Sequence, residues 1–238
     1  MQLQCSPLDA VARRAGAVMV PRNGWSVPAH YGSPAGELAV CSRGVGMVDR
    51  SEIGKLELCG DPDVLDLLLY DLTDRQLEPN GVLRVGGVQW CAASPERVFA
   101  FCEPSELSSL SERINSAVGR GSSVLLTDET DELAAVGLLG PAGPSVIAAL
   151  GAWSLDTIRL PQPSFAATMF EGLPVYLLEE SSNRSLVLIE RLYAEELWHL
   201  LERVGRPFGL SCVGSEAAER FAMIERRLRA TARPASLA

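Results

Sequence analysis

The sequence has little histidine and no closely spaced cysteine pair. Only His30 and His199 are present, so a histidine-rich metal site is excluded and no metal is expected. The six cysteines lie far apart, with no C-x-x-C pair among them. This spacing is typical of reduced, buried thiols in a cytoplasmic protein, and it argues against a zinc site or a disulfide framework.

The common catalytic signatures are also missing. The chain has no G-x-G-x-x-G opening a helix, no G-x-x-x-x-G-K-[ST] loop and no G-x-S-x-G elbow, which removes support for those nucleotide and hydrolase sites. Catalysis by a histidine-activated nucleophile would need His30 or His199. We expect His199 on a helix surface and His30 in a hydrogen-bonding or surface position, so the sequence predicts no catalytic residue.

No membrane segment is expected. The N-terminal residues MQLQCSPLDAVARRAG are too polar for a signal peptide. The uncharged run from Leu133 to Leu155 contains Pro141 and Pro144, which would break a spanning helix. A buried strand, a turn and a short helix fit this run better.

Positive charge is scarce where nucleic acid would need it. The net charge is −9, and residues 51–140 alone carry −10. Sequence-independent binding to DNA or RNA requires a row of basic side chains, so a nucleic-acid partner is excluded. The one basic cluster, Arg226, Arg227 and Arg229, is typical of a helix C-terminus, although an anionic partner is an alternative.

Proline after a capping residue predicts several helices. The pairs Ser6-Pro7, Ser33-Pro34, Asp61-Pro62, Glu103-Pro104 and Gly143-Pro144 each open one. Two further helices are expected at 194–204 and 215–228. Apolar strand-like runs lie between them, at 52–59, 88–93, 97–102, 123–128, 133–139, 173–179 and 185–191. Short turns join many of these runs, which favours an α+β fold with mostly antiparallel sheets.

One acidic pair has two interpretations. Glu179 and Glu180 follow a predicted strand and precede Arg184. They either face a pocket beside Arg184 or belong to a solvated turn.

Two stretches resemble a known family. Residues 19–60 contain Gly24-Trp25, Pro28 and Tyr31-Gly32, then a helix, Gly46 to Asp49 and Ser51 to Lys55. Residues 126–151 contain an aspartate-rich turn, a strand, Gly-Pro and a helix. Both resemble the T-protein (aminomethyltransferase) of the glycine cleavage system, and residues 214–225 resemble a late helix of its folate-binding portion.

The resemblance implies a two-lobed folate-binding fold. The expected bounds are 1–158 and 165–229, with a joint at 159–165 and a disordered tail at 230–238. By this resemblance, the C-terminal barrel of a T-protein would begin where the given sequence ends. The implied cofactor is tetrahydrofolate.

The chain departs from the family at the expected site. After Gly86-Gly87 the family has an Asp-Asp pair, and Gln89 stands there instead; Gln89 forms hydrogen bonds but carries no charge. The later family motif that ends in a pterin-binding Glu is replaced by residues 178–184. The resemblance therefore implies no catalytic residue here, and it gives as candidate folate-binding residues Ile53, Gln89, Glu180 and Arg184.

Three functions follow from the resemblance. The first is a diverged tetrahydrofolate-dependent one-carbon transferase of the aminomethyl type. The second is a non-catalytic subunit similar to the small gamma subunit of heterotetrameric sarcosine oxidase, whose partner would be a larger flavoprotein or transferase subunit; a homo-oligomer is the other expectation. The third, the folate-binding iron–sulfur maintenance type, ranks last because its Lys-Gly-Cys-Tyr-Thr-Gly-Gln motif is absent.

Overall fold

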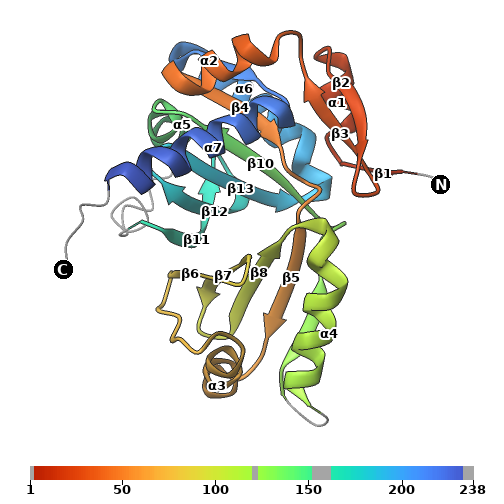
Figure 1. Ribbon diagram of the computed structural model, residues 1–238, viewed down its shortest axis with the longest axis vertical. Helices are drawn as coiled ribbons and strands as arrows, with labels where there is room; N and C mark the ends of the chain where they lie inside the picture. The colour runs from red at the N-terminus through yellow and green to blue at the C-terminus, as the bar shows by residue number, and fades with distance from the viewer. Residues whose placement is uncertain (1–2, 120–122, 152–161, 233–238) are drawn as a thin grey trace.

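The computed structural model describes residues 3–119, 123–151 and 162–232 (Figure 1). The chain forms two lobes, each built on a β-sheet with helices against it, and a small third sheet lies beside the upper lobe.

The upper lobe contains a six-stranded sheet. Its strand order is β11-β12-β13-β10-β4-β14, and every neighbouring pair is antiparallel except β14 with β4. The strands are β11 (Ser164–Phe170), β12 (Leu173–Ser181), β13 (Arg184–Glu190), β10 (Leu133–Leu139), β4 (Val45–Asp49) and β14 (Leu210–Cys212).

Helices cover both faces of this sheet. One face packs against residues of α1 (Asp9–Arg14), α5 (Gly143–Ala149) and α6 (Ala194–Gly205) in a core that includes Trp198. Part of the other face packs against α2 (Pro34–Arg43) and α7 (Ser215–Ala232) through Val48, Leu139 and Phe221.

The lower lobe contains a five-stranded antiparallel sheet in the order β6-β7-β8-β5-β9. Its strands are β6 (Val82–Val85), β7 (Val88–Ser94), β8 (Arg97–Cys102), β5 (Gly54–Cys59) and β9 (Leu125–Asp128). One face packs against α3 (Pro62–Thr73) and α4 (Leu107–Val118), and η1 (Pro104–Glu106) precedes α4.

The two large sheets contact each other through an aromatic cluster. Phe99 and Phe101 of β8 pack against Phe165 of β11, and the ring centroids lie 5.7 and 5.8 Å apart. Tyr176 of β12 adds a stacked contact with Phe165. This shared core fixes one lobe against the other and leaves the rest of the upper sheet's face for α7 and a pocket.

The third sheet has three strands, β1 (Gln4–Cys5), β3 (Trp25–His30) and β2 (Val18–Arg22), in the order β1-β3-β2. Its β2–β3 turn reaches α7, where Arg22 forms an ion pair with Glu219. The short helices η3 (Arg191–Tyr193) and η4 (Arg206–Phe208) flank α6.

The predicted α+β class with mostly antiparallel sheets is confirmed. Asp61 caps α3 as expected, because its carboxylate accepts hydrogen bonds from the Asp63 and Val64 N–H groups. The helix expected after Ser6-Pro7 instead begins at Asp9: the Ser6 hydroxyl accepts from the Leu8 N–H and closes a turn before it.

The structure differs from the expected bounds of the joint and of the C-terminal tail. Ser164 and Phe165, placed in the joint, lie in β11, while residues 159–161 fall outside the described residues. The tail expected from 230 is helical through Ala232, and 233–238 fall outside the described residues. His199 lies on the exposed side of α6 beside Glu195 and Glu202.

Within the described ranges, no helix is long and apolar enough to cross a membrane. The same residues hold no group of three or more His, Cys, Asp or Glu side chains placed to bind a metal ion. All six cysteines are free, and Cys41, Cys91 and Cys102 are buried.

Candidate functional site

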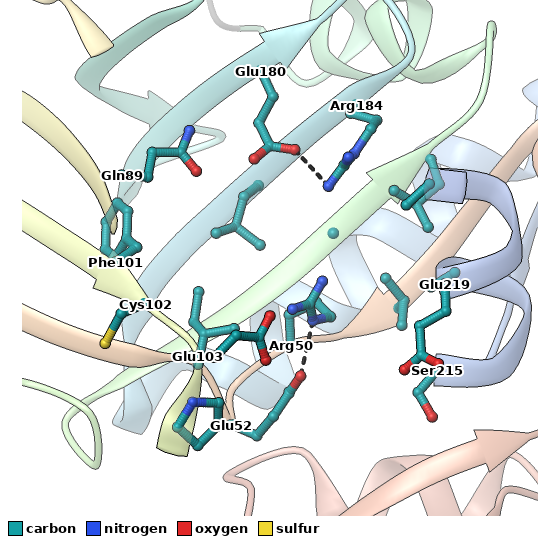
Figure 2. Close-up of a pocket in the computed structure, with 18 of the residues that line it drawn as sticks. Arg50, Glu52, Gln89, Phe101, Cys102, Glu103, Glu180, Arg184, Ser215 and Glu219 are labelled. Carbon is teal, nitrogen blue, oxygen red and sulfur yellow. Dashed lines mark hydrogen bonds and ion pairs between the residues drawn. The ribbon is translucent and has the colours of Figure 1, made fainter. Parts of the chain in front are cut away.

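A pocket of about 390 Å³ lies where the two lobes and α7 meet (Figure 2). The upper sheet lines one side of it, with Val48 from β4, Gly137 from β10 and Leu186 from β13. A volume of this size is within the range of small-molecule sites in proteins.

The first wall is the segment 50–54, which connects β4 of the upper lobe to β5 of the lower lobe. Three of its side chains, Arg50, Glu52 and Ile53, line the pocket. Arg50 donates from Nε to Glu52 Oε1 at 2.9 Å. Burial works to lower the pKa of Arg50, but the carboxylates of Glu52, Glu103 and Glu180 together outweigh it and the pKa rises.

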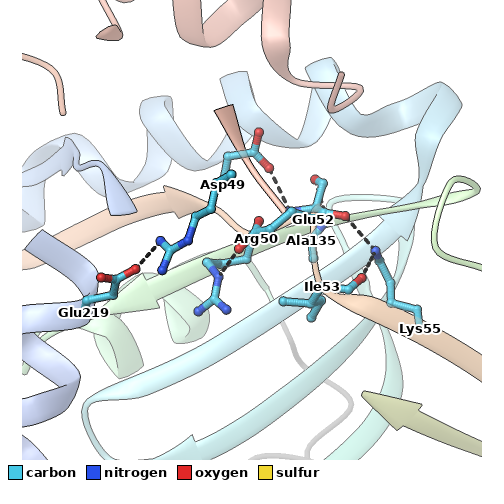
Figure 3. Close-up of polar contacts among 9 residues, drawn as sticks. Asp49, Arg50, Glu52, Ile53, Lys55, Ala135 and Glu219 are labelled. Atoms are coloured by element: carbon cyan, nitrogen blue, oxygen red, sulfur yellow. Dashed lines mark hydrogen bonds and ion pairs between the residues drawn. The ribbon is translucent and has the colours of Figure 1, made fainter. Parts of the chain in front are cut away.

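Hydrogen bonds from buried groups fix this first wall (Figure 3). The Arg50 N–H donates to the Ala135 carbonyl at 2.8 Å, and the Ser51 hydroxyl accepts from the Ala135 N–H at 3.1 Å. The Ser51 N–H donates to Asp49 Oδ1 at 3.0 Å. Two hydrogen bonds therefore attach the first wall to β10, and a third joins Ser51 to Asp49 at the end of β4.

Lys55 also holds the first wall in place, through its buried ammonium group. This residue, the single lysine of the chain, is fully buried and donates from Nζ to the carbonyls of Ser51, Ile53 and Thr130, at 2.9, 2.8 and 3.0 Å. Burial lowers its pKa to about 8, although nearby carboxylates favour the charged form. Three carbonyl acceptors satisfy the ammonium group, which explains how a lysine is tolerated there.

The second wall is the β6–β7 hairpin. Its turn residues Gly86 and Gly87 have φ of +57° and +83°, a backbone conformation that glycine adopts without strain. This tight turn brings Arg84 and Gln89 side by side, and Arg84 donates to Gln89 Oε1 at 3.3 Å. Because Arg84 can only donate, this contact identifies the oxygen of the Gln89 amide. The amide nitrogen, Nε2, is then buried with no hydrogen-bond acceptor among the described residues.

The third wall is the end of the β12–β13 hairpin, where two arginines share one carboxylate. Arg84 donates to Glu180 Oε1 at 2.5 Å, and Arg184 lies 2.8 Å from Glu180 Oε2. Burial lowers the pKa of Arg184. Its Nε lies 3.9 Å from Glu225 on α7, too far for a hydrogen bond, and has no acceptor within the described part of the chain.

The rim carries further charged side chains. Arg22 pairs with Glu219, and Arg226 lies on α7 at the same pocket. Glu103 follows β8 at the rim and is exposed. Cys102 also lines the pocket, but burial raises the pKa of its thiol to about 11, so it remains protonated at neutral pH.

The charges around the pocket are therefore nearly balanced within a strongly acidic chain. Five arginines and four glutamates line it. Arg84 donates a hydrogen bond to one oxygen of Glu180 and Arg184 forms an ion pair with the other, so arginines hold both oxygens in place. The pocket is suited to bind and orient a ligand that offers hydrogen-bond acceptors and negative charge.

All four residues selected from the sequence, Ile53, Gln89, Glu180 and Arg184, line this one pocket. Of the two interpretations of Glu180, the structure has it in β12 and facing the pocket, whereas the turn itself lies at 182–183.

Sequence reasoning missed other charged residues of the pocket, namely Arg22, Arg50, Glu52, Arg84, Glu103 and Glu219. Arg84, two residues before Gly86 of the Gly86-Gly87 turn, had the clearest signal, because a tight turn fixes the positions of the strand residues near it. Nothing local marks Glu219 as a partner of Arg22.

The fold of the chain is similar to those of two kinds of solved protein. The aminomethyltransferase T of the glycine cleavage system from Bartonella henselae superimposes with a TM-score of 0.75, over 92% of this chain and 62% of that protein, at 15% identity. The chain has the T-protein fold. A chain of the heterotetrameric sarcosine oxidase from Corynebacterium sp. U-96 gives a TM-score of 0.66 at 18% identity, over 87% of this chain and 96% of that one.

Curated sequences agree with the T-protein fold. The aminomethyltransferase of Streptomyces avermitilis is 26% identical over 85% of this chain and 58% of its own length, and that of Streptomyces coelicolor is 24% identical over 89% and 61%. The chain thus spans about three fifths of the length of the curated relatives it matches. No family model matches the chain.

Proposed function

We propose that the pocket binds tetrahydrofolate and that the chain is a diverged one-carbon transferase of the aminomethyl type. The similarity to proteins named aminomethyltransferase supports the class of reaction. The observation that carries the proposal is Gln89 Nε2, a buried donor at the pocket that no described residue satisfies. Buried donors are normally paired, so this one indicates a ligand acceptor.

The residues present fit a reduced folate in three respects. Ile53, Phe101 and Leu186 supply apolar surface for a flat ring system. Gln89 and the Nε of Arg184 are donors for the acceptor atoms of that ring. Arg226, on the α7 side of the pocket, supplies positive charge for a carboxylate tail.

The chain's own part in the reaction is to bind and to orient. Bound tetrahydrofolate would supply the nitrogen that carries the one-carbon unit. Arg84 and Arg184 hold Glu180 in place, and the segment 50–54 presents Ile53 from a fixed backbone. Gln89 cannot act as the charged group that the family has at this point, because an amide takes no proton at neutral pH.

A second candidate function is a non-catalytic subunit of a larger complex. Two observations favour it. Glu180 is held by two arginines, and Gln89 stands at the position where the family has an aspartate. The chain also covers 96% of a chain from a heterotetrameric enzyme, so the likeness extends over nearly that whole subunit. This function predicts co-purification with a larger flavoprotein or transferase, and a native chain that stays monomeric beside such proteins contradicts it.

Anaerobic calorimetric titration with tetrahydrofolate tests the binding proposal. We expect saturable binding by the wild-type chain and about tenfold weaker binding by Gln89→Ala, the effect of losing one buried hydrogen bond. Gln76→Ala is the matched control, since Gln76 is exposed and does not line the pocket. Absence of heat at about 1 mM ligand, the weak-binding limit, contradicts the proposal.

A further inference from the structure

Strand β11 forms one edge of the upper sheet, where β12 pairs along its length and Gly81 bridges to Ser164 at its start (Figure 1). The Phe165 N–H donates to the Asn80 carbonyl, on the side away from β12. Main-chain groups of alternate strand residues point to the same side, so those of Ala167 and Met169 also point away from β12. Neither residue has a hydrogen bond on that side within the described part of the chain.

The sequence of this edge strand does not protect it from further pairing. Residues 164–170 read Ser-Phe-Ala-Ala-Thr-Met-Phe, with no charged residue and no proline. The register with β12 runs without a bulge from Ser164 to Phe170. Proteins usually protect an exposed edge strand with charges, proline or a bulge. An unprotected edge therefore indicates that another strand covers it.

A groove of about 340 Å³ adjoins this edge. Its lining includes residues of three neighbouring strands: Ala167 and Met169 of β11, Pro174 and Tyr176 of β12, and Leu188 and Glu190 of β13. Ala167 pairs with Tyr176, and Tyr176 pairs with Leu188, so their side chains share one face of the sheet. Ala167 is small and exposed, and the side chain of a residue paired with it can therefore enter the groove and reach Tyr176.

The charge at the groove is negative. Glu190 lines the groove, and Glu132 precedes Leu133, the residue paired with Glu190. Both glutamates are exposed, and neither has an ion pair within the residues that the structure describes. Three arginines of neighbouring segments already have partners, namely Arg97 with Glu57, Arg191 with the Asp131 carbonyl and Arg203 with Glu171. An occupant with basic side chains is therefore favoured over an acidic one.

We propose that β11 binds an extended segment of a partner protein as an added antiparallel strand. The segment exchanges hydrogen bonds with the main chain of Ala167 and Met169, and its apolar side chain opposite Ala167 fills the groove. Basic residues at its ends lie in the negative field of Glu190 and Glu132. In this mode of recognition the main-chain hydrogen bonds give affinity and the groove gives selectivity.

This inference is independent of the proposed function. Ala167, Met169 and Glu190 do not line the pocket proposed to bind tetrahydrofolate. Loss of peptide binding and loss of tetrahydrofolate binding are therefore separate results.

Fluorescence polarisation of the full chain with a labelled peptide tests the proposal. The probe is Lys-Val-Thr-Leu-Thr-Val-Lys, in which the two Val and the Leu share one face of a strand and the Lys residues lie at the ends. We expect saturable binding with a Kd between roughly 10 µM and 1 mM, the weak range of a small contact. Absence of saturable binding up to about 1 mM overturns the proposal.

Two N-methylated forms of the peptide test the strand pairing itself. A methyl group on the Leu nitrogen removes a donor that faces β11, whereas one on the following Thr nitrogen faces away from it. Methylation at Leu should weaken binding by about tenfold or more, and methylation at Thr should leave it within about threefold. Equal effects of the two methyl groups overturn the proposal.

A substitution that fills the groove tests the place of binding. Ala167→Trp should weaken peptide binding by about tenfold or more, while Ala39→Trp, at an exposed alanine of α2, should bind as the wild-type chain does. Urea denaturation shows that both variants are folded. Unchanged binding by folded Ala167→Trp overturns the proposal.

The charge and the alternative occupant have tests of their own. Glu190→Lys should weaken binding at low salt and not at about 1 M salt, where the Debye length is near 3 Å. Sedimentation velocity of the wild-type chain without peptide detects pairing of β11 with a second copy. Self-association that Ala167→Trp abolishes would make the occupant a second copy and overturn the proposal.

Discussion

The first and second walls of the pocket differ in how their polar groups are satisfied. At the segment 50–54, the Ser51 hydroxyl accepts from the Ala135 N–H of β10, and Lys55 donates to the carbonyls of Ser51, Ile53 and Thr130, at 2.8–3.1 Å. On the β6–β7 side, Gln89 Nε2 is buried without an acceptor among the described residues. The difference separates a wall whose hydrogen bonds stabilise the fold from one whose donor is available to a ligand, and substitutions can test that separation.

The largest expected effect is on the first wall. Lys55→Met should lower the free energy of unfolding by about 3 kcal/mol, because three buried carbonyls lose their donor at once. Urea denaturation measures it. Arg43→Met, at an exposed position, is the control and should stay within about 0.5 kcal/mol of wild type. A Lys55→Met chain as stable as the control would show that the first wall does not depend on this contact.

The pH dependence of the free energy of unfolding also tests the role of Lys55. In the unfolded chain Lys55 titrates at 10.5, and in the folded chain its pKa is about 8. Between these values the unfolded state binds more protons, so this group's contribution to stability increases with pH, by about 2 kcal/mol from pH 8 to 10. Buried thiols act in the opposite direction, because burial raises their pKa values.

The measured quantity is therefore a difference between two chains. The free energy of unfolding of wild type minus that of Lys55→Met should increase over this pH range, since the thiols of Cys41 and Cys212, whose pKa shifts have no contribution from Lys55, act equally in both. A difference that is flat or decreases with pH refutes the assignment.

A substitution in the second wall should change the affinity for tetrahydrofolate and not the free energy of unfolding. Gln89→Leu should weaken tetrahydrofolate binding about tenfold while the free energy of unfolding stays the same or increases, because the substitution removes an unsatisfied buried donor. Parallel calorimetry and urea denaturation separate the two quantities. A loss of stability with unchanged affinity would reverse the roles of the two walls.

The smallest effect is expected at Arg84. Its side chain is 54% exposed, so its ion pair with Glu180 is screened by solvent, and Arg84→Met should lower the free energy of unfolding by no more than about 1 kcal/mol. Arg203→Met is a matched comparison, since Arg203 is 64% exposed and pairs with Glu171 within the upper lobe. A much larger loss at Arg84 than at Arg203 would mean that the ion pair between the lobes holds them together.

The sequence predicted what depends on local signals. Asp61-Pro62 and Ser33-Pro34 each begin a helix, because a capping side chain followed by proline specifies a helix start without help from the rest of the chain. Strand β3 was not predicted, because Pro28 weakens the strand signal of residues 25–30 and it is the pairing with β1 and β2 that forms the strand.

Of the residues that line the pocket, the sequence predicted only those that lie in or near recognisable motifs. Ile53 and Gln89 follow motifs that resemble the T-protein family, and Glu180 and Arg184 are neighbours in sequence. The contact of Arg84 with Glu180 spans 96 residues. Such a contact depends on how the two lobes pack, which neither spacing nor periodicity encodes.

The side-chain amide of Gln89 itself gives the most direct test of the separation between the walls. In a ¹⁵N-labelled chain, the Gln89 side-chain resonance can be assigned by its loss in Gln89→Leu and followed as tetrahydrofolate is added. We predict a saturable shift of this resonance with slower exchange of its protons, while the exposed Gln76 side-chain resonance stays in place. Saturable binding that leaves the Gln89 resonance unmoved would contradict the account, because the buried donor would then not be where the ligand is held.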